Sequence, residues 1–152
     1  SLAESIYAKF RDTEWAIKVY TKAESEAKDS DDFCGLADSL CENLGDEETA
    51  IRLYKKAESQ AKASYEFRDI ADSMCNKLGD RKWAKKMYAK SENKAETFYE
   101  FHWLANCIYE NIGDQEWAKR VSKKAEGKAR YQYEINCLAN GIYKKLGVKP
   151  TQ

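Results

Sequence analysis

Residues 64–96 read SYEFRDIADSMCNKLGDRKWAKKMYAKSENKAE, and this stretch decides the fold. Its first half carries an apolar stripe at helical spacing: Phe67, Ile70, Ala71, Met74 and Leu78. Gly79 follows at once, and glycine readily takes the left-handed conformation that ends a helix. Asp80 then offers a carboxylate that can cap a second helix. The inward stripe of that helix comprises Trp83, Ala84, Met87, Ser91 and Ala95. The stretch predicts an antiparallel helix pair, with helix A before the turn and helix B after it.

The helix pair recurs along the chain with a fixed period. Four turns, each 34 residues after the one before, mark it: Leu44-Gly45-Asp46, Leu78-Gly79-Asp80, Ile112-Gly113-Asp114 and Leu146-Gly147-Val148. A period of this length is typical of stacked repeats, in which each unit buries its apolar face against its neighbours. The pattern therefore predicts an all-α, right-handed α-solenoid of stacked antiparallel helix pairs, with about nine helices.

The period also predicts the domain organisation, a single array over residues 1–152. It contains about four and a half repeats, at residues 1–34, 35–68, 69–102, 103–136 and 137–152. Because the sequence opens inside a repeat, we expect a fragment of a longer array. The last A helix is expected from about Tyr133 to Leu146, with a frayed tail after it.

Composition narrows the class of protein. The chain is 43% hydrophobic and 34% charged, which is typical of a globular protein and not of a disordered one. Its only proline is Pro150, so the rest of the chain is free to be helical. It has no apolar run of membrane-spanning length. Because it opens without a basic-then-apolar segment, we expect no signal peptide. The five cysteines form no CxxC pair and predict reduced thiols in a cytoplasmic protein.

The repeat resembles the tetratricopeptide repeat, a 34-residue helix–turn–helix unit. The resemblance rests on the Gly113-Asp114 turn, on Ala118 and Ala125 in helix B, and on Leu104-Ala105 in helix A. It extends over the whole chain with two departures. The Leu-Ala pair lies one residue farther from the turn glycine, so helix A or its turn is longer by one residue. The proline that usually closes each unit is missing.

The resemblance implies that the A helices line a concave groove that binds a peptide or a helix of another protein. Asn106 and Asn140 align with an asparagine that bonds the peptide backbone in that family, but the basic residues of the family's carboxylate clamp do not recur. The aromatic A-helix columns either face this groove or pack between adjacent A helices. The predicted binding residues are Tyr65, Arg68, Asp72, Tyr99, His102, Trp103, Asn106, Tyr109, Tyr133, Asn136, Asn140 and Tyr143.

Two further columns are interpreted as structural. Trp15, Trp83 and Trp117 begin helix B at the same position and are expected to pack inward. Lysine and glutamate alternate later in helix B, as in Lys90 and Glu92, and are expected to form a solvated face.

No catalytic or cofactor motif is present. The sequence contains no nucleotide-binding loop, no nucleophile elbow and no metal-binding helix motif. His102 with Cys75 or Cys41 would supply too few ligands for a tetrahedral metal site. We therefore expect a non-enzymatic protein–protein interaction scaffold without cofactor or metal.

Two alternatives stay open. One is an RNA-binding helical repeat that uses the basic B helices of the second half, although the net charge of zero argues against it. The cations in question are Lys82, Lys85, Lys86, Lys90, Lys94, Lys119, Arg120, Lys123, Lys124 and Lys128. The other is a designed or purely structural array without a natural ligand, against which the scattered cysteines and irregular substitutions argue.

The charges are unevenly distributed along the chain. Residues 1–76 hold 10 Lys and Arg against 17 Asp and Glu, whereas residues 77–152 hold 16 against 9. This asymmetry predicts weak head-to-tail self-association at low ionic strength.

Overall fold

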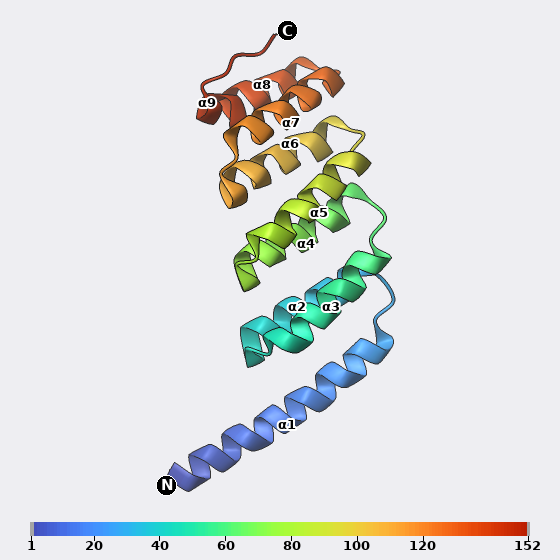
Figure 1. The fold of residues 1–152 in the computed structure, drawn as a ribbon, viewed down its shortest axis with the longest axis vertical. Coiled ribbons are helices and arrows are strands. Elements are labelled where there is room, and N and C mark those ends of the chain that lie inside the picture. The colour runs from blue at the N-terminus through green and yellow to red at the C-terminus, as the bar shows by residue number, and fades with distance from the viewer. Residues whose placement is uncertain (1, 152) are drawn as a thin grey trace. The chain divides into compact units, whose positions relative to one another are not determined.

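The protein is described by a computed structural model that covers the backbone of residues 2–151 and the side chains of residues 12–151. All regular secondary structure in this range is helical, which confirms the all-α prediction. The chain divides into two compact units, Ser1–Ala61 and Lys62–Gln152, and each is described by itself. Figure 1 labels the α-helices; η1 and η2 are π-helical turns that continue α4 and α6.

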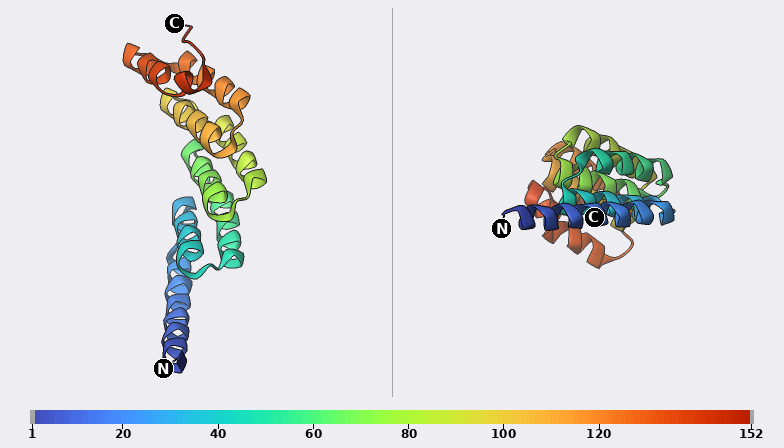
Figure 2. Two further views of the ribbon diagram at one scale, coloured as in Figure 1. Left: turned by 90° about the vertical axis from the view of Figure 1, so that its left-hand side faces the viewer. Right: turned by 90° about the horizontal axis from the view of Figure 1, so that it is seen from below.

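The first unit contains one long helix and one helix pair. Helix α1 is Leu2–Glu26, α2 is Ser30–Leu44 and α3 is Glu47–Gln60. Figure 2 shows α2 and α3 side by side. Gly45 ends α2 in the left-handed region, at φ 64°, and Asp46 caps α3 by accepting a hydrogen bond from the Thr49 amide at 3.1 Å. The core of the pair comprises Cys34, Ala37, Leu40, Ala50, Leu53, Tyr54 and Ala57.

Helix α1 differs from the expected helix A, turn and helix B. It runs without interruption through Arg11, which occupies the position 34 residues before Gly45. An arginine opposes the left-handed conformation that a turn requires here and favours a helix, so α1 continues. The prediction for Trp15 is wrong as well, because its side chain is 69% exposed.

The second unit contains two complete helix pairs and a shorter third element. The A helices are α4 (Ser64–Ser73) with η1 (Met74–Leu78), α6 (Phe98–Cys107) with η2 (Ile108–Ile112), and α8 (Gln132–Asn140) with α9 (Ile142–Leu146). The B helices are α5 (Arg81–Lys94) and α7 (Gln115–Lys128). Gly79 and Gly113 end the A helices at φ 65° and 73°, and Asp80 and Asp114 cap the B helices. The predicted turn chemistry is confirmed at both turns.

The extra residue in helix A coincides with the π-helical turns of the second unit. In η1 and η2 each hydrogen bond spans one residue more than in an α-helix, so the turn holds one residue more before the glycine. Helix α2 has the same spacing to its glycine and is α-helical to Leu44. The longer spacing is thus compatible with either helix type.

The last A helix is interrupted at Gly141, between α8 and α9. A Cβ atom at this position would lie 2.8 Å from the carbonyl oxygen of Cys137, so the backbone here accommodates only glycine without a shift. Predicted as one helix, this segment is instead two. The tail beyond it, expected to fray, is hydrogen-bonded: Thr151 donates its Oγ1 hydrogen to Glu126 at 2.7 Å, and Lys123 donates to the Lys149 carbonyl at 3.2 Å.

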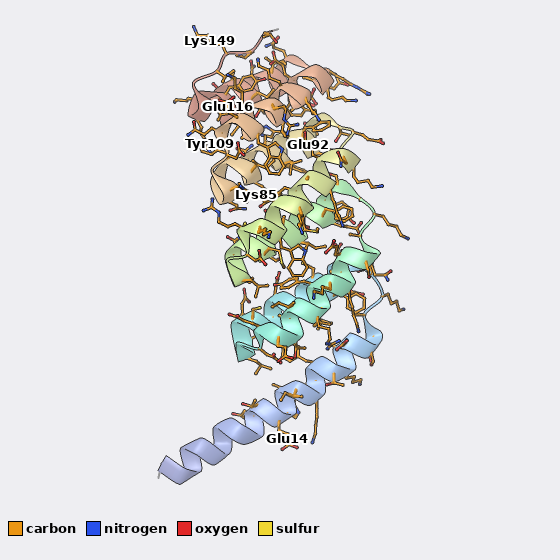
Figure 3. The ribbon with its side chains drawn as sticks, viewed as in Figure 1. Glu14, Lys85, Glu92, Tyr109, Glu116 and Lys149 are labelled. Carbon is orange, nitrogen blue, oxygen red and sulfur yellow. The ribbon has the colours of Figure 1, made fainter. Side chains whose placement is uncertain are left out.

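Glutamates on the B helices are enclosed by donors and do not all form the solvated face that was expected. Glu92, labelled in Figure 3, is only 8% exposed. It accepts hydrogen bonds from Trp117 Nε1 at 2.7 Å, Arg120 Nη1 at 2.5 Å and Lys124 Nζ at 2.8 Å. Burial opposes its charge, but the donors on Lys124, Trp117 and Arg120 outweigh burial and lower the pKa of Glu92. Glu92 therefore links α5 to α7 by hydrogen bonds.

None of the described helices combines the length and the apolar character that crossing a bilayer demands.

Candidate functional site: an aromatic strip on the second unit

Exposed aromatic side chains gather on the A helices of the second unit. Five large rings are between 41% and 59% exposed and form what we name the aromatic strip: Tyr65, Tyr99, Trp103, Tyr131 and Tyr133. The aromatic rings of the B helices differ, since Tyr88 is fully buried and Trp83 and Trp117 are half-buried. The strip is thus a property of the A-helix side.

The start of each A helix places its tyrosine. At α4, α6 and α8 a glutamate folds back to accept the amide hydrogen three residues earlier, with Glu66, Glu100 and Glu134 at 2.7, 3.0 and 3.1 Å. This arrangement of the first turn defines the direction in which the helix begins. Tyr65, Tyr99 and Tyr133 each precede the glutamate by one residue, so the three tyrosines occupy equivalent positions.

Four rings of the strip contact one another. Tyr99 and Trp103 lie one helical turn apart on α6, with ring centroids separated by 5.8 Å. Tyr131 and Tyr133 stack with a centroid distance of 5.5 Å and an interplanar angle of 9°. The Tyr99 hydroxyl donates to the Tyr133 hydroxyl at 3.4 Å and so connects α6 with α8. These contacts restrict the rotamers of the rings before any partner binds.

A hollow of about 410 Å³ adjoins Trp103. It is lined by Arg68, Asp72, Trp103, Asn106 and Cys107, which come from α4 and α6. The guanidinium of Arg68 lies 5.5 Å from the centre of the Trp103 ring, a cation–π arrangement. Arg68 also donates to Asp69 at 2.9 Å. Arg68 of α4 thus contacts one face of the otherwise exposed Trp103 indole.

A polar network supports the bottom of this hollow. Asp72 accepts hydrogen bonds from Tyr88 at 2.5 Å, from Asn111 at 3.1 Å and from the Cys107 thiol at 3.7 Å. Burial raises the pKa of Asp72, and the bonds from Tyr88 and Cys107 only partly offset this rise. Burial, together with the nearby Asp72 carboxyl, also raises the pKa of the Cys107 thiol to about 12. Asp72 and Cys107 therefore act as structural supports of the hollow.

The structure brings seven of the predicted binding residues to the strip and its hollow: Tyr65, Arg68, Asp72, Tyr99, Trp103, Asn106 and Tyr133. Asn106 uses one amide hydrogen on the His102 carbonyl of its own helix, at 2.9 Å, and keeps its place in the lining. The other five predicted residues lie elsewhere.

His102 is half-buried, and its ring stacks on Phe98 at 5.5 Å with an interplanar angle of 8°. Burial lowers the pKa of His102 and favours the neutral ring. Within the described residues, its Nδ1 is the buried side-chain atom that lacks a hydrogen-bond partner. His102 therefore serves as a packing residue here.

Tyr143 was predicted to bind and is instead completely buried. Its hydroxyl donates to Glu126 at 2.5 Å, and Lys123 covers its ring at 4.8 Å. The reason is the packing of α9 against α7, which directs the tyrosine into the unit. The equivalent Tyr109 is half-buried beside Lys145. Asn136 and Asn140 are exposed on α8 and do not line the hollow.

Two residues of this site were missed by sequence reasoning. Tyr131 belongs to the strip, but Thr97 and Ala63 occupy its position in the earlier repeats, so no column indicated it. Cys107 lines the hollow, where the earlier repeat has Ser73. The one available sign of Tyr131 in the sequence was a second tyrosine, Tyr133, two residues after it.

Groups of three or more His, Cys, Asp or Glu side chains arranged to hold a metal ion do not occur among the described residues. No protein-family model, curated protein or solved structure matches the chain.

Proposed function

We propose that the chain is a non-enzymatic interaction scaffold and that the aromatic strip binds a peptide or a helix of another protein. The observation that carries the proposal is the set of five exposed aromatic rings at the A helices, of which Trp103 lines the hollow between α4 and α6. Exposed aromatic patches of this kind are typical of protein-binding surfaces. Tyrosine and tryptophan offer a large contact area at a low cost in rotamer entropy, and they dominate binding hot spots.

Trp103 is the expected centre of the interface. It is 52% exposed, it borders the hollow, and its ring contacts Tyr99 and Arg68. A side chain that is already restricted loses little entropy on binding. An apolar partner residue that enters the hollow would cover the exposed part of the indole and remove it from water.

The charges on α4 and α6, beside Trp103, favour a protein over a nucleic acid. Helix α4 carries Glu66, Asp69 and Asp72 against the single cation Arg68, and α6 carries Glu100. Carboxylates at these positions repel phosphates and are compatible with a neutral or basic polypeptide segment.

We further propose that the helix pairs form a right-handed solenoid similar to tetratricopeptide arrays. In support, α3, α5 and α7 each contain 14 residues and each follows a Gly-Asp turn. In such an array the A helices line the concave side, where the strip would lie. Helix pairs of equal length also favour regular stacking.

The experiment must distinguish protein binding by the strip from the alternative, RNA binding by the B helices. Lys82, Lys85 and Lys86 are exposed on α5. The basic set is smaller than the sequence suggests, because Arg120 and Lys124 pair with Glu92 and Lys123 pairs with Glu126.

The test is affinity capture from a cell lysate, with and without nuclease, followed by mass spectrometry. Wild type is compared with Trp103→Ala and with the matched surface variant Lys82→Ala/Lys85→Ala/Lys86→Ala. A captured protein is then titrated as a purified ligand against all three chains. We expect Trp103→Ala to weaken binding by about 2 kcal/mol or more and the lysine variant to bind normally.

The opposite pattern contradicts the proposal. Capture that is lost with nuclease and lost in the lysine variant identifies RNA as the ligand. Unchanged affinity of Trp103→Ala for every captured protein removes the strip from the interface.

A further inference from the structure

The set of donors around Glu92 has a counterpart in the first unit. Glu24 on α1 accepts hydrogen bonds from Arg52 at 2.5 and 2.8 Å and from Lys56 at 2.5 Å, both on α3. These donors lie 28 and 32 residues after Glu24. Arg120 and Lys124 lie at the same separations from Glu92. A B-helix glutamate thus meets two cations, four residues apart, on the next B helix.

Glu126 on α7 occupies the corresponding position at the end of the second unit, but its donors are different. It is held by Lys123 at 2.9 Å, by Tyr143 at 2.5 Å and by the amide and hydroxyl of Thr151. Thr151 lies 25 residues after Glu126, the same separation at which Trp117 contacts Glu92. The tail residue Thr151 therefore takes the place that a tryptophan of a following helix B takes at Glu92.

Helix α1 presents the matching set of donors on an exposed surface. Trp15, Lys18 and Lys22 have the same spacing as Trp117, Arg120 and Lys124, three residues and then four. Trp15 is 69% exposed, and Lys18 and Lys22 are exposed as well. Lys18 contacts Glu14 at 3.4 Å in an exposed pair, which contributes little and is easily exchanged.

We propose that a second copy of this chain docks its α1 on the Glu126 end of the first, with Trp15, Lys18 and Lys22 as donors to Glu126. Trp15 replaces Thr151 at the carboxylate, and the two ammonium groups replace the cations found at Glu24 and Glu92. The contact is head-to-tail and heterologous, so it can continue from copy to copy.

The charges of the two units favour the same association. Residues 1–61 hold 8 Lys and Arg against 14 Asp and Glu, and residues 62–152 hold 18 against 12. The acidic first unit of one copy therefore meets the basic second unit of another. Because Thr151 must first leave Glu126, the association is weak and depends on ionic strength.

The test is sedimentation velocity of the full chain in 0.01 M and 0.15 M salt, where the screening length is about 30 Å and about 8 Å. The head variant is Lys18→Glu/Lys22→Glu, and the end variant is Glu126→Gln, which keeps the size of the side chain. The matched control is Lys28→Glu/Lys55→Glu, which changes the charge of residues 1–61 equally at exposed positions outside the donor set.

We expect the wild type and the control to associate at low salt and the head and end variants to associate at least about tenfold more weakly. Mixing the head variant with the end variant restores a one-to-one complex, because one chain retains the intact head and the other the intact end. A monomeric wild type at high concentration in 0.01 M salt overturns the proposal, and so does association that persists in the head variant.

A second measurement covers the case in which Glu126→Gln does not fold. Benzoylphenylalanine in place of Trp15 should crosslink on irradiation to residues 143–151 of another chain, as mapped by mass spectrometry. Crosslinks confined to other regions contradict the proposed contact.

Discussion

Residues 2–26 form one helix, whereas residues 64–94 form two helices that fold against each other. Residues 2–26 align with residues 70–94 at the turn aspartate (Asp12 and Asp80) and at the helix-B tryptophan (Trp15 and Trp83), and among the positions that differ is the residue before the turn aspartate. It is Arg11 in the first segment and Gly79 in the second. Gly79 takes φ 65°, a conformation that costs an L-residue roughly 1–2 kcal/mol. The comparison indicates that a glycine at this position favours the turn, whereas an arginine favours a continuous helix.

The consequence of this difference is visible in the tryptophan at the start of helix B. Trp117 follows a turn, packs edge-on against Tyr88 at 6.5 Å and donates to Glu92. Trp15 occupies the equivalent position in α1 and is mostly exposed. The same residue in the same register is therefore structural in one segment and available for contact in the other.

We expect the largest difference in stability when these two tryptophans are replaced. Trp117→Ala should lower the free energy of unfolding by about 3 kcal/mol, because it removes a packed ring and one of the three donors to the buried Glu92 carboxylate. Trp15→Ala should change it by less than about 0.5 kcal/mol. Urea unfolding of both variants, followed by circular dichroism, provides the measurement. Equal losses would contradict the assignment of different roles.

The next effect concerns the attachment of α1 by Glu24. Hydrogen bonds from Arg52 and Lys56 lower the pKa of Glu24 from 4.5 to about 2. A depressed carboxyl pKa means that the stabilisation is present above pH 4.5 and is lost as the pH falls towards 2. The contribution is on the order of 1–3 kcal/mol. Hydrogen exchange should therefore show α1 opening as the pH falls through this window.

Two variants control that measurement. In Glu24→Gln, α1 should already be less protected at neutral pH, and its protection should change less with acid. In Glu14→Gln, where an exposed pair is altered, the acid dependence should stay as in the wild type. If the hydrogen-exchange protection of α1 in the wild type does not depend on pH, Glu24 is not the main residue that holds α1 on α3.

The smallest effect is expected from exchanging the two turn residues. Gly79→Arg should cost about 1–2 kcal/mol, because the packed helix pair holds the position in the left-handed region. Arg11→Gly should cost up to about 1 kcal/mol, because glycine weakens a helix interior. Amide exchange near residue 11 should accelerate in the second variant. Unchanged exchange there would show that Arg11 is not what keeps α1 continuous.

Sequence reasoning located the helix pairs from α2 to α7, their Gly-Asp turns and most of the aromatic strip, but neither the single helix α1 nor the interruption at Gly141. It succeeded there because these features depend on local chemistry: a stripe at helical spacing, a glycine at positive φ, and an aspartate cap. It failed for Tyr143, for the glutamates expected to be solvated and for Trp15. Each of these three outcomes depends on whether another helix packs over the residue, and the repeat pattern alone does not contain that information.

The amino-acid sequence by itself determined that this protein is all-α, where the helix pairs of its second unit turn, and that aromatic side chains concentrate on its A helices. The tertiary structure alone decided which of those rings are exposed, that Glu92 and Glu126 are enclosed by donors, and that Thr151 reaches back to Glu126. The physical reason is that helix propensity and capping act within a few residues of chain. Burial and buried hydrogen bonds instead depend on which helices lie next to each other, since only neighbours exclude water from a side chain.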